Sequence, residues 1–178
     1  MISDIKEVLY SEEQIRSKAR ELGKRISEDY RGQEVVCVGI LKGSVMFMAD
    51  LLKEIEIPCY MDFMAVSSYG NSSQSSGIVR ILKDLDYEIE GKNVIVVEDI
   101  IDSGITLNYL MGYFKSRGAK SIEIACLLNK HERRKVEIDV KYLGYDVEDH
   151  FLVGYGLDFA EKYRNLPFIG ILKEEVYK

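Results

Sequence analysis

The feature that most restricts the fold of this chain is a series of apolar, β-branched runs that alternate with helical patterns. The runs EVVCVGIL (34–41), NVIVVEDI (93–100) and SIEIACLLNK (121–130) contain few polar residues, as strands buried on both faces do. Helical patterns follow the first two runs, at 45–55 and at 107–114. This order predicts an α/β fold in which helices flank a mostly parallel central sheet.

Weaker patterns fill the remaining parts of the chain. Ser11 and Gln14 have the spacing of a capping box, and apolar residues at helical spacing follow them as far as Gly32. Further strands are predicted at 60–67, 78–85, 140–145, 151–157 and 168–173, the second of them as an antiparallel or neighbouring partner of the first. The polar segment YGNSSQSSG (69–77) separates those two strands.

Length and charge narrow the class of protein. A chain of 178 residues suits one domain, and 47% hydrophobic with 30% charged residues is the balance of an ordered globular protein. No apolar run approaches the ~18 residues needed to span a bilayer, and MISDIKEVLY lacks the basic start of a secretory signal. We therefore expect a cytoplasmic protein that does not enter a membrane. A net charge of −6 disfavours broad nucleic-acid binding.

The segment VIVVEDIIDSGITLNYL (94–110) joins a predicted strand to a predicted helix through an unusual loop. In the stretch from Asp102 to Thr106, backbone N–H groups would point outward together with the positive end of the helix dipole, and Ser103 and Thr106 add hydroxyl donors. Gly104 permits close approach of a ligand. This geometry suits a phosphate group, although an ordinary helix cap would use the same residue types.

Two adjacent carboxylates, Glu98 and Asp99, stand just before that loop. They would repel one another and any nearby phosphate unless sugar hydroxyls or a magnesium ion compensate their charge. A phosphorylated sugar with Mg²⁺ supplies both. The segment has neither the lysine of the G-x-x-x-x-G-K-[ST] loop nor the glycines of the dinucleotide turn.

The stretch VIVVEDIIDSGIT (94–106) resembles the 5-phosphoribosyl 1-pyrophosphate (PRPP) motif of the type I phosphoribosyltransferases. LKGS (41–44), SSYG (67–70) and FLVGYGLDFAEKYRNLP (151–167) are similar to further segments of the branch that uses 6-oxopurines. The resemblance implies the type I phosphoribosyltransferase fold with a small hood and a flexible lid loop. It also implies transfer of the phosphoribosyl group from PRPP to hypoxanthine or guanine, giving IMP or GMP and pyrophosphate, with Mg²⁺ as cofactor.

The same resemblance implies roles for individual residues. Asp102 is the candidate general base. The other implied roles are PRPP and phosphate binding by Glu98, Asp99, Asp102, Ser103, Gly104, Ile105 and Thr106; pyrophosphate binding by Lys42, Gly43, Arg134 and Arg164; purine binding by Lys130, Phe151 and Leu152; a lid that includes Ser68 and Tyr69; and metal binding by Glu98, Asp99 and Asp158.

Some of these implications leave alternatives open. Arg133 is close enough to Arg134 to take its role, and Ile105 stands where a basic residue is common in the family, at a contact made by the backbone. The family has a cis peptide before the residue that matches Lys42, and its members are usually homodimers or homotetramers.

Rival functions also remain. Within the same fold, the substrate could be xanthine, adenine, orotate or uracil, although the ammonium of Lys130 favours a base with a 6-oxo acceptor. A PRPP-sensing regulator of nucleic acid and a flavodoxin-like binding module are the alternatives from other classes. The first needs a basic face, and the second makes no use of the paired acids.

Overall fold

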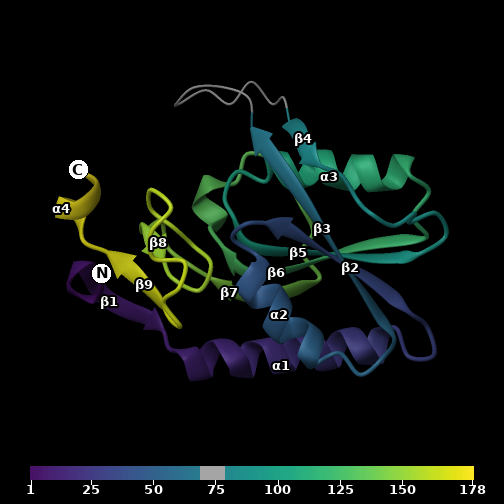
Figure 1. The fold of residues 1–178 in the computed structure, drawn as a ribbon, viewed down its shortest axis with the longest axis horizontal. Helices are drawn as coiled ribbons and strands as arrows, with labels where there is room; N and C mark the ends of the chain where they lie inside the picture. The colour runs from purple at the N-terminus through teal and green to yellow at the C-terminus, as the bar shows by residue number, and fades with distance from the viewer. Residues whose placement is uncertain (69–78) are drawn as a thin grey trace.

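The computed structural model describes residues 1–68 and 79–178, in which a six-stranded sheet forms the centre (Figure 1). Its strand order is β4-β3-β2-β5-β6-β7, and all neighbours are parallel except β3 and β4, which pair antiparallel. The strands are β2 (Val35–Leu41), β3 (Cys59–Ser68), β4 (Val79–Lys83), β5 (Asn93–Ile101), β6 (Ser121–Asn129) and β7 (Tyr142–Asp146). The predicted α/β class and mostly parallel sheet are confirmed.

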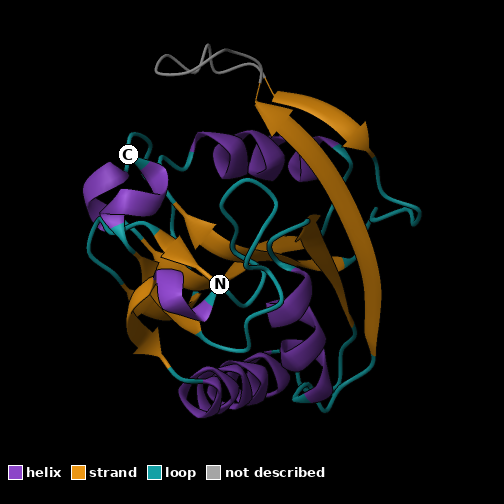
Figure 2. Ribbon diagram, turned by 60° about the vertical axis from the view of Figure 1, so that its left-hand side comes forward, coloured by secondary structure: helices purple, strands orange, loops and turns teal. Residues whose placement is uncertain are grey.

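Helices cover both faces of this sheet, as Figure 2 shows. α1 (Glu12–Asp29) and α2 (Val45–Lys53) lie on one face, and α3 (Ile105–Ser116) lies on the other. Neighbouring residues of one strand pack into different cores, because successive side chains of a strand point to opposite faces. Cys37 of β2 packs with α1 and α2, whereas Val38 packs with α3.

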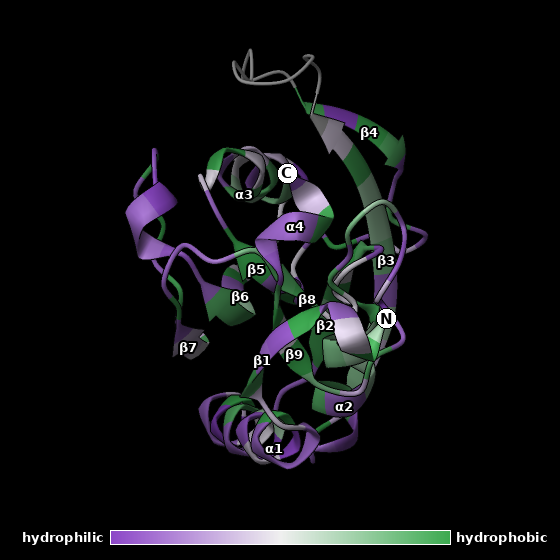
Figure 3. Cartoon of the chain, turned by 90° about the vertical axis from the view of Figure 1, so that its left-hand side faces the viewer, coloured by the Kyte–Doolittle hydropathy of each residue, from purple (hydrophilic) through white to green (hydrophobic). Residues whose placement is uncertain are grey.

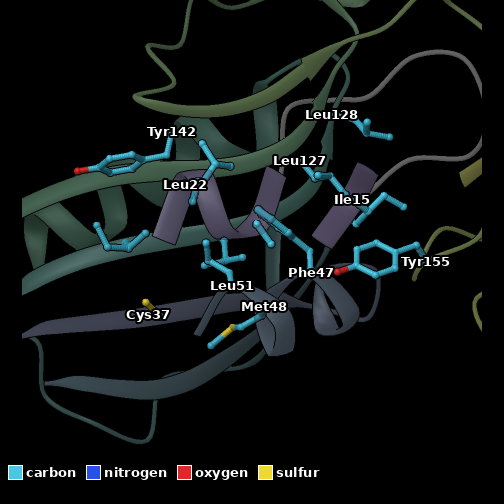
Figure 4. Close-up of a cluster of buried hydrophobic side chains, with 14 of the residues drawn as sticks. Ile15, Leu22, Cys37, Phe47, Met48, Leu51, Leu127, Leu128, Tyr142 and Tyr155 are labelled. Atoms are coloured by element: carbon cyan, nitrogen blue, oxygen red, sulfur yellow. The ribbon is translucent and has the colours of Figure 1, made fainter. Parts of the chain in front are cut away.

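The core between the sheet and helices α1 and α2 is the larger of these two cores. Phe47 and Leu51 of α2 meet Ile15 and Leu22 of α1 there, and all four side chains are fully buried (Figure 4). The capping box predicted for α1 is present, since the side chains of Ser11 and Gln14 each bond the backbone of the other residue. The central strands are hydrophobic along most of their length, while polar residues dominate the outer side of α1 (Figure 3).

A second, three-stranded sheet in the order β1-β9-β8 forms the hood (Figure 1). It consists of β1 (Ile5–Tyr10), β8 (Leu152–Val153) and β9 (Ile169–Leu172), with antiparallel pairing throughout. Three short helical segments complete the described chain: the 3-10 turns η1 (Ile2–Asp4) and η2 (His131–Arg133), and α4 (Glu174–Tyr177). The sequence patterns did not predict β1, although they predicted strands around β8 and β9.

None of the helices within residues 1–68 and 79–178 has the length and apolar character needed to cross a bilayer. The predicted lid residue Tyr69 and the polar segment that follows it lie outside the described residues.

Candidate active site

The site is built at the carboxyl end of β5, which lies between β2 and β6 in the middle of the sheet. Ligands of open parallel sheets bind at this edge. Val94 to Val97 are fully buried, whereas Glu98 and Asp99 are half-buried and reach a cavity. The buried run therefore anchors the strand, and the two carboxylates are presented where it ends.

The predicted phosphate loop turns sharply from β5 into α3. Gly104 has φ of 80°, a left-handed conformation that glycine adopts without strain, and it is the N-cap of α3. Ser103 Oγ accepts a hydrogen bond from the Ile105 N–H (3.3 Å). A cavity of about 340 Å³ lies against this turn, and Glu98, Asp99, Asp102, Ser103, Gly104 and Thr106 contribute to its lining. Carboxylates thus line the same cavity as the positive end of a helix.

The Lys42–Gly43 loop closes one side of this cavity. The Leu41–Lys42 peptide bond is cis, as the resemblance implied. A side chain at Gly43 would overlap with the carboxylate of Asp99, and one at Gly156 would overlap with the carbonyl oxygen of Gly43. The loop is therefore held between the acidic end of β5 and the segment that follows β8.

A second cavity of about 400 Å³ adjoins the first one, and the residues predicted to bind purine lie in its wall. Lys130, Phe151 and Leu152 line it. Asp99, Ile100 and Asp102 line both cavities, so the two meet at the end of β5. A two-part ligand that occupied both cavities would therefore pass Asp99, Ile100 and Asp102 at their junction.

Lys130 is almost completely buried, with 8% of its surface exposed. Its ammonium nitrogen lies 3.9 Å from Asp102 Oδ1 and 3.4 Å from Asp149 Oδ1. Phe151 stacks on Tyr177 with ring centroids 4.7 Å apart and meets the edge of Phe159 at 5.4 Å. The wall of this cavity therefore combines a cation with a supported aromatic ring.

Charged residues of the segment after β8 lie beside the Lys42 loop. Arg164 pairs with Asp158 (2.9 Å) and donates to the carbonyl of Gly156 (2.7 Å). Lys42 pairs with Glu161 (2.9 Å), which also lies 3.4 Å from Arg164. The structure thus brings three of the predicted residues, Lys42, Arg164 and Asp158, into one charged network.

Arg133 and Arg134, which the sequence did not distinguish, point to different cavities. Arg133 lines the cavity that contains Lys130 and lies 2.7 Å from Asp149. Arg134 lines a separate cavity with His131 and Ile138, and its guanidinium contacts Asn129. Its stem packs under Gly104, so this arginine supports the phosphate loop from behind. A pyrophosphate contact by Arg134 stays a prediction.

Burial dominates the electrostatics of the paired acids. Burial, together with the charge of neighbouring Asp99, raises the pKa of Glu98 well above its usual value. Burial also raises the pKa of Asp99, against a smaller opposing effect of the Ile100 N–H, which donates to Asp99 Oδ1 (2.8 Å). The site therefore stabilises a ligand that brings hydrogen-bond donors or positive charge to these oxygens.

This electrostatic strain predicts that Glu98→Gln stabilises the ligand-free protein at pH 7, raising its unfolding midpoint by roughly 2–4 °C for each kcal/mol of relieved repulsion. Because its pKa is raised in the folded protein, Glu98 binds more protons there than in the unfolded chain. The free energy of unfolding of the wild type therefore falls as pH rises toward that raised pKa. The gain should consequently shrink as pH falls. Thermal unfolding in EDTA, with exposed Glu88→Gln as control, tests this, and equal midpoints at pH 7 would contradict it.

Magnesium fits the donor set of this site. Glu98 and Asp99 are adjacent carboxylates, and carboxylates are hard oxygen ligands. Their raised pKa values indicate that a bound cation would stabilise their charged forms. No group of three or more His, Cys, Asp or Glu side chains is assembled for a metal ion within residues 1–68 and 79–178. Mg²⁺ commonly takes one or two protein carboxylates and completes its shell with water and phosphate oxygens.

Several residues at the site were not predicted from the sequence. Asp149 contacts Lys130 and Arg133, Glu161 pairs with Lys42, and Tyr177 stacks on Phe151. Ile100 lines both cavities. The two acids in VEDHF (147–151), just before the predicted purine-binding residue Phe151, were the one available signal for Asp149.

The chain is similar to proteins of one family. Residues 7–160 match the family model described as phosphoribosyl transferase domain. The hypoxanthine-guanine phosphoribosyltransferase of Streptococcus agalactiae is 55% identical over 175 residues, which are 98% of this chain and 97% of that protein. The Bacillus subtilis protein of the same name is 53% identical over 178 residues, covering 100% of this chain and 99% of the relative.

A solved structure gives the same result. The crystal structure of a hypoxanthine phosphoribosyltransferase from Staphylococcus aureus superposes with a TM-score of 0.97 at 51% sequence identity. The match covers 100% of this chain and 97% of that one. The likeness therefore includes the hood and the central sheet together.

Proposed function

The chain belongs to the phosphoribosyl transferase domain family, and from this premise we propose that it serves 6-oxopurine salvage. It transfers the 5-phosphoribosyl group of PRPP to hypoxanthine or guanine, giving IMP or GMP and pyrophosphate. The junction of the two cavities at Asp99, Ile100 and Asp102 carries this proposal. One cavity suits the phosphorylated sugar, the other suits the base, and the new bond forms between them.

The phosphoribosyl side of the reaction uses the end of β5 and the start of α3. The N–H groups and hydroxyls of residues 103 to 106 bind the 5-phosphate, because the helix dipole and the turn favour an anion there. Glu98 and Asp99 accept hydrogen bonds from the ribose hydroxyls. Their negative charge also stabilises the sugar as it turns cationic in the transition state.

The purine side uses the cavity around Lys130. The Lys130 ammonium donates to the 6-oxo group, Phe151 stacks on the ring and Leu152 contacts its edge through the backbone. Asp102 takes the imidazole proton of the base while the other nitrogen attacks the sugar carbon. The carboxylate of Asp102 is half-exposed and lines both cavities, which suits a group that meets both substrates.

The leaving group departs toward the Lys42–Gly43 loop. The ammonium of Lys42 and the N–H groups of its loop stabilise pyrophosphate, and Arg164 adds positive charge from the facing segment. Glu98, Asp99 and Asp158 would hold magnesium, which supplies charge neutralisation for pyrophosphate oxygens when bound. The roles of Arg134 and of a lid including Ser68 and Tyr69 stay predictions.

Three wider features belong to the same proposal. Residues 1–178 act as one phosphoribosyltransferase domain, a reading supported by the near-complete coverage of relatives of similar length. The protein works in the cytoplasm and assembles as a homodimer or homotetramer.

The test is direct. Purified protein is incubated with PRPP, Mg²⁺ and one base at a time from a panel of hypoxanthine, guanine, xanthine, adenine, orotate and uracil, and nucleotide formation is followed. We expect IMP and GMP with release of pyrophosphate, and no AMP. Nucleotide from adenine, orotate or uracil alone would assign a different substrate class, and consumption of no base would overturn the transferase proposal.

A further inference from the structure

Asp149 lies opposite Lys130 in the purine-side cavity, and the sequence motifs gave it no role. Two backbone hydrogen bonds fix the segment that carries it: the Val147 N–H donates to the Asn129 carbonyl (2.9 Å), and the His150 N–H donates to the Glu148 carbonyl (2.8 Å) across Asp149. The first ties this segment to the end of β6, directly before Lys130. The side chain of Asp149 therefore faces the lysine as a consequence of the backbone path.

Among the residues that the structure describes, the ammonium of Lys130 has two carboxylate neighbours. Asp149 is the nearer at 3.4 Å, and Asp102 lies at 3.9 Å. A buried ammonium needs compensating charge and hydrogen-bond acceptors, because burial disfavours its charged form. If Asp102 were the only acid nearby, Lys130 would pair with it and turn away from the base. The second acid balances that attraction.

Arg133 keeps Asp149 in place and in the charged state. The Arg133 Nε lies 2.7 Å from Asp149 Oδ1, and this contact, with Lys130, lowers the pKa of Asp149. The 3-10 turn η2 positions that guanidinium, since the Arg133 N–H donates to the Lys130 carbonyl (3.2 Å). Asp149 is thus a carboxylate held in place by a basic group on each side.

We propose that Asp149 is a positioning residue for recognition of the 6-oxo group. It holds the Lys130 ammonium toward the base and away from Asp102, so that Lys130 can donate to the purine oxygen while Asp102 remains free to accept a proton. This inference rests on the proposed function, because it concerns the same cavity and the same base.

Two nucleotides isolate this effect without depending on turnover. IMP carries the 6-oxo group, and purine riboside 5′-monophosphate lacks it while keeping the ribose and phosphate. Dissociation constants for both are measured with wild type, Asp149→Asn, Asp149→Glu and the matched control Glu148→Gln. Glu148 is the adjacent acid and pairs with His150 (3.1 Å) rather than with the lysine.

We expect wild type and Glu148→Gln to prefer IMP, and Asp149→Asn to lose roughly tenfold of that preference, the scale of one hydrogen bond to a charged group. Affinity for the analogue should change little, and Asp149→Glu should restore part of the preference by restoring the charge. Thermal unfolding verifies that each variant is folded, and Asp149→Ser replaces the asparagine variant if that one is not.

The outcomes separate the two proposals. If wild type binds neither nucleotide, the proposed function fails and this inference fails with it. If wild type prefers IMP and Asp149→Asn keeps the whole preference, the function stands and the role of Asp149 is overturned. An equal loss in Glu148→Gln would also overturn it, because the effect would then reflect general negative charge near the cavity.

Discussion

Replacing Asp102 with asparagine is expected to lower the rate of the chemical step by roughly 10²–10⁴, the usual contribution of a positioned general base. Asparagine keeps the size of the side chain and can still accept a hydrogen bond, but it cannot take the imidazole proton of the purine. Asp102 lines both cavities, so its carboxylate lies where base and sugar meet. Affinity for PRPP should remain within a few-fold of wild type.

Single-turnover experiments give the clearest measurement, because slow product release can hide a change in chemistry. Enzyme in excess over PRPP is mixed with saturating hypoxanthine, and IMP formation is followed in wild type and variant. Exposed Asp139→Asn is the control for loss of one negative charge. An Asp102→Asn variant that forms IMP at the wild-type rate would remove Asp102 from the role of base.

The half of the site formed by β5 and α3 could be predicted from the sequence because its residues are contiguous in the chain. A buried run, two acids and a glycine turn occur within residues 94–106, and local rules for strands, caps and anion sites apply to them directly. The structure places Glu98, Asp99, Asp102, Ser103, Gly104 and Thr106 at one cavity, while the run 94–97 stays in the core. The helices could be predicted too, because the spacing of their apolar residues determines which side faces the sheet.

Features that form by contact between distant parts of the chain could not be predicted from local sequence patterns. β1 has a mixed burial pattern and forms by pairing with β9, more than 150 residues later, so no local periodicity marks it. Arg133 and Arg134 are adjacent at the end of a 3-10 turn, where neighbouring side chains point in different directions. Only the path of the backbone decides that Arg133 enters the cavity with Lys130.

The contact between the Lys42–Gly43 loop and β5 is a second example, and it predicts a large effect of one methyl group. A Cβ atom at position 43 would overlap with Oδ2 of Asp99, whose other oxygen is held by the Ile100 N–H. The loop cannot retreat, because the Gly43 carbonyl packs closely against Gly156 on its far side. Gly43→Ala must therefore displace either the acid or the loop.

We expect Gly43→Ala to lower kcat/KM for PRPP by about 10², the scale of a displacement of about 1 Å in a catalytic site. Gly112→Ala is the matched control: Gly112 lies in α3, a Cβ there meets no atom within 4 Å, and removal of a helical glycine should stabilise the fold by about 0.5–1 kcal/mol. Kinetics with PRPP as the varied substrate and thermal unfolding separate the two effects. Wild-type kinetics in Gly43→Ala would show that Asp99 and the loop move apart without cost, and the proposed coupling between the sugar-binding acid and the pyrophosphate loop would then be wrong.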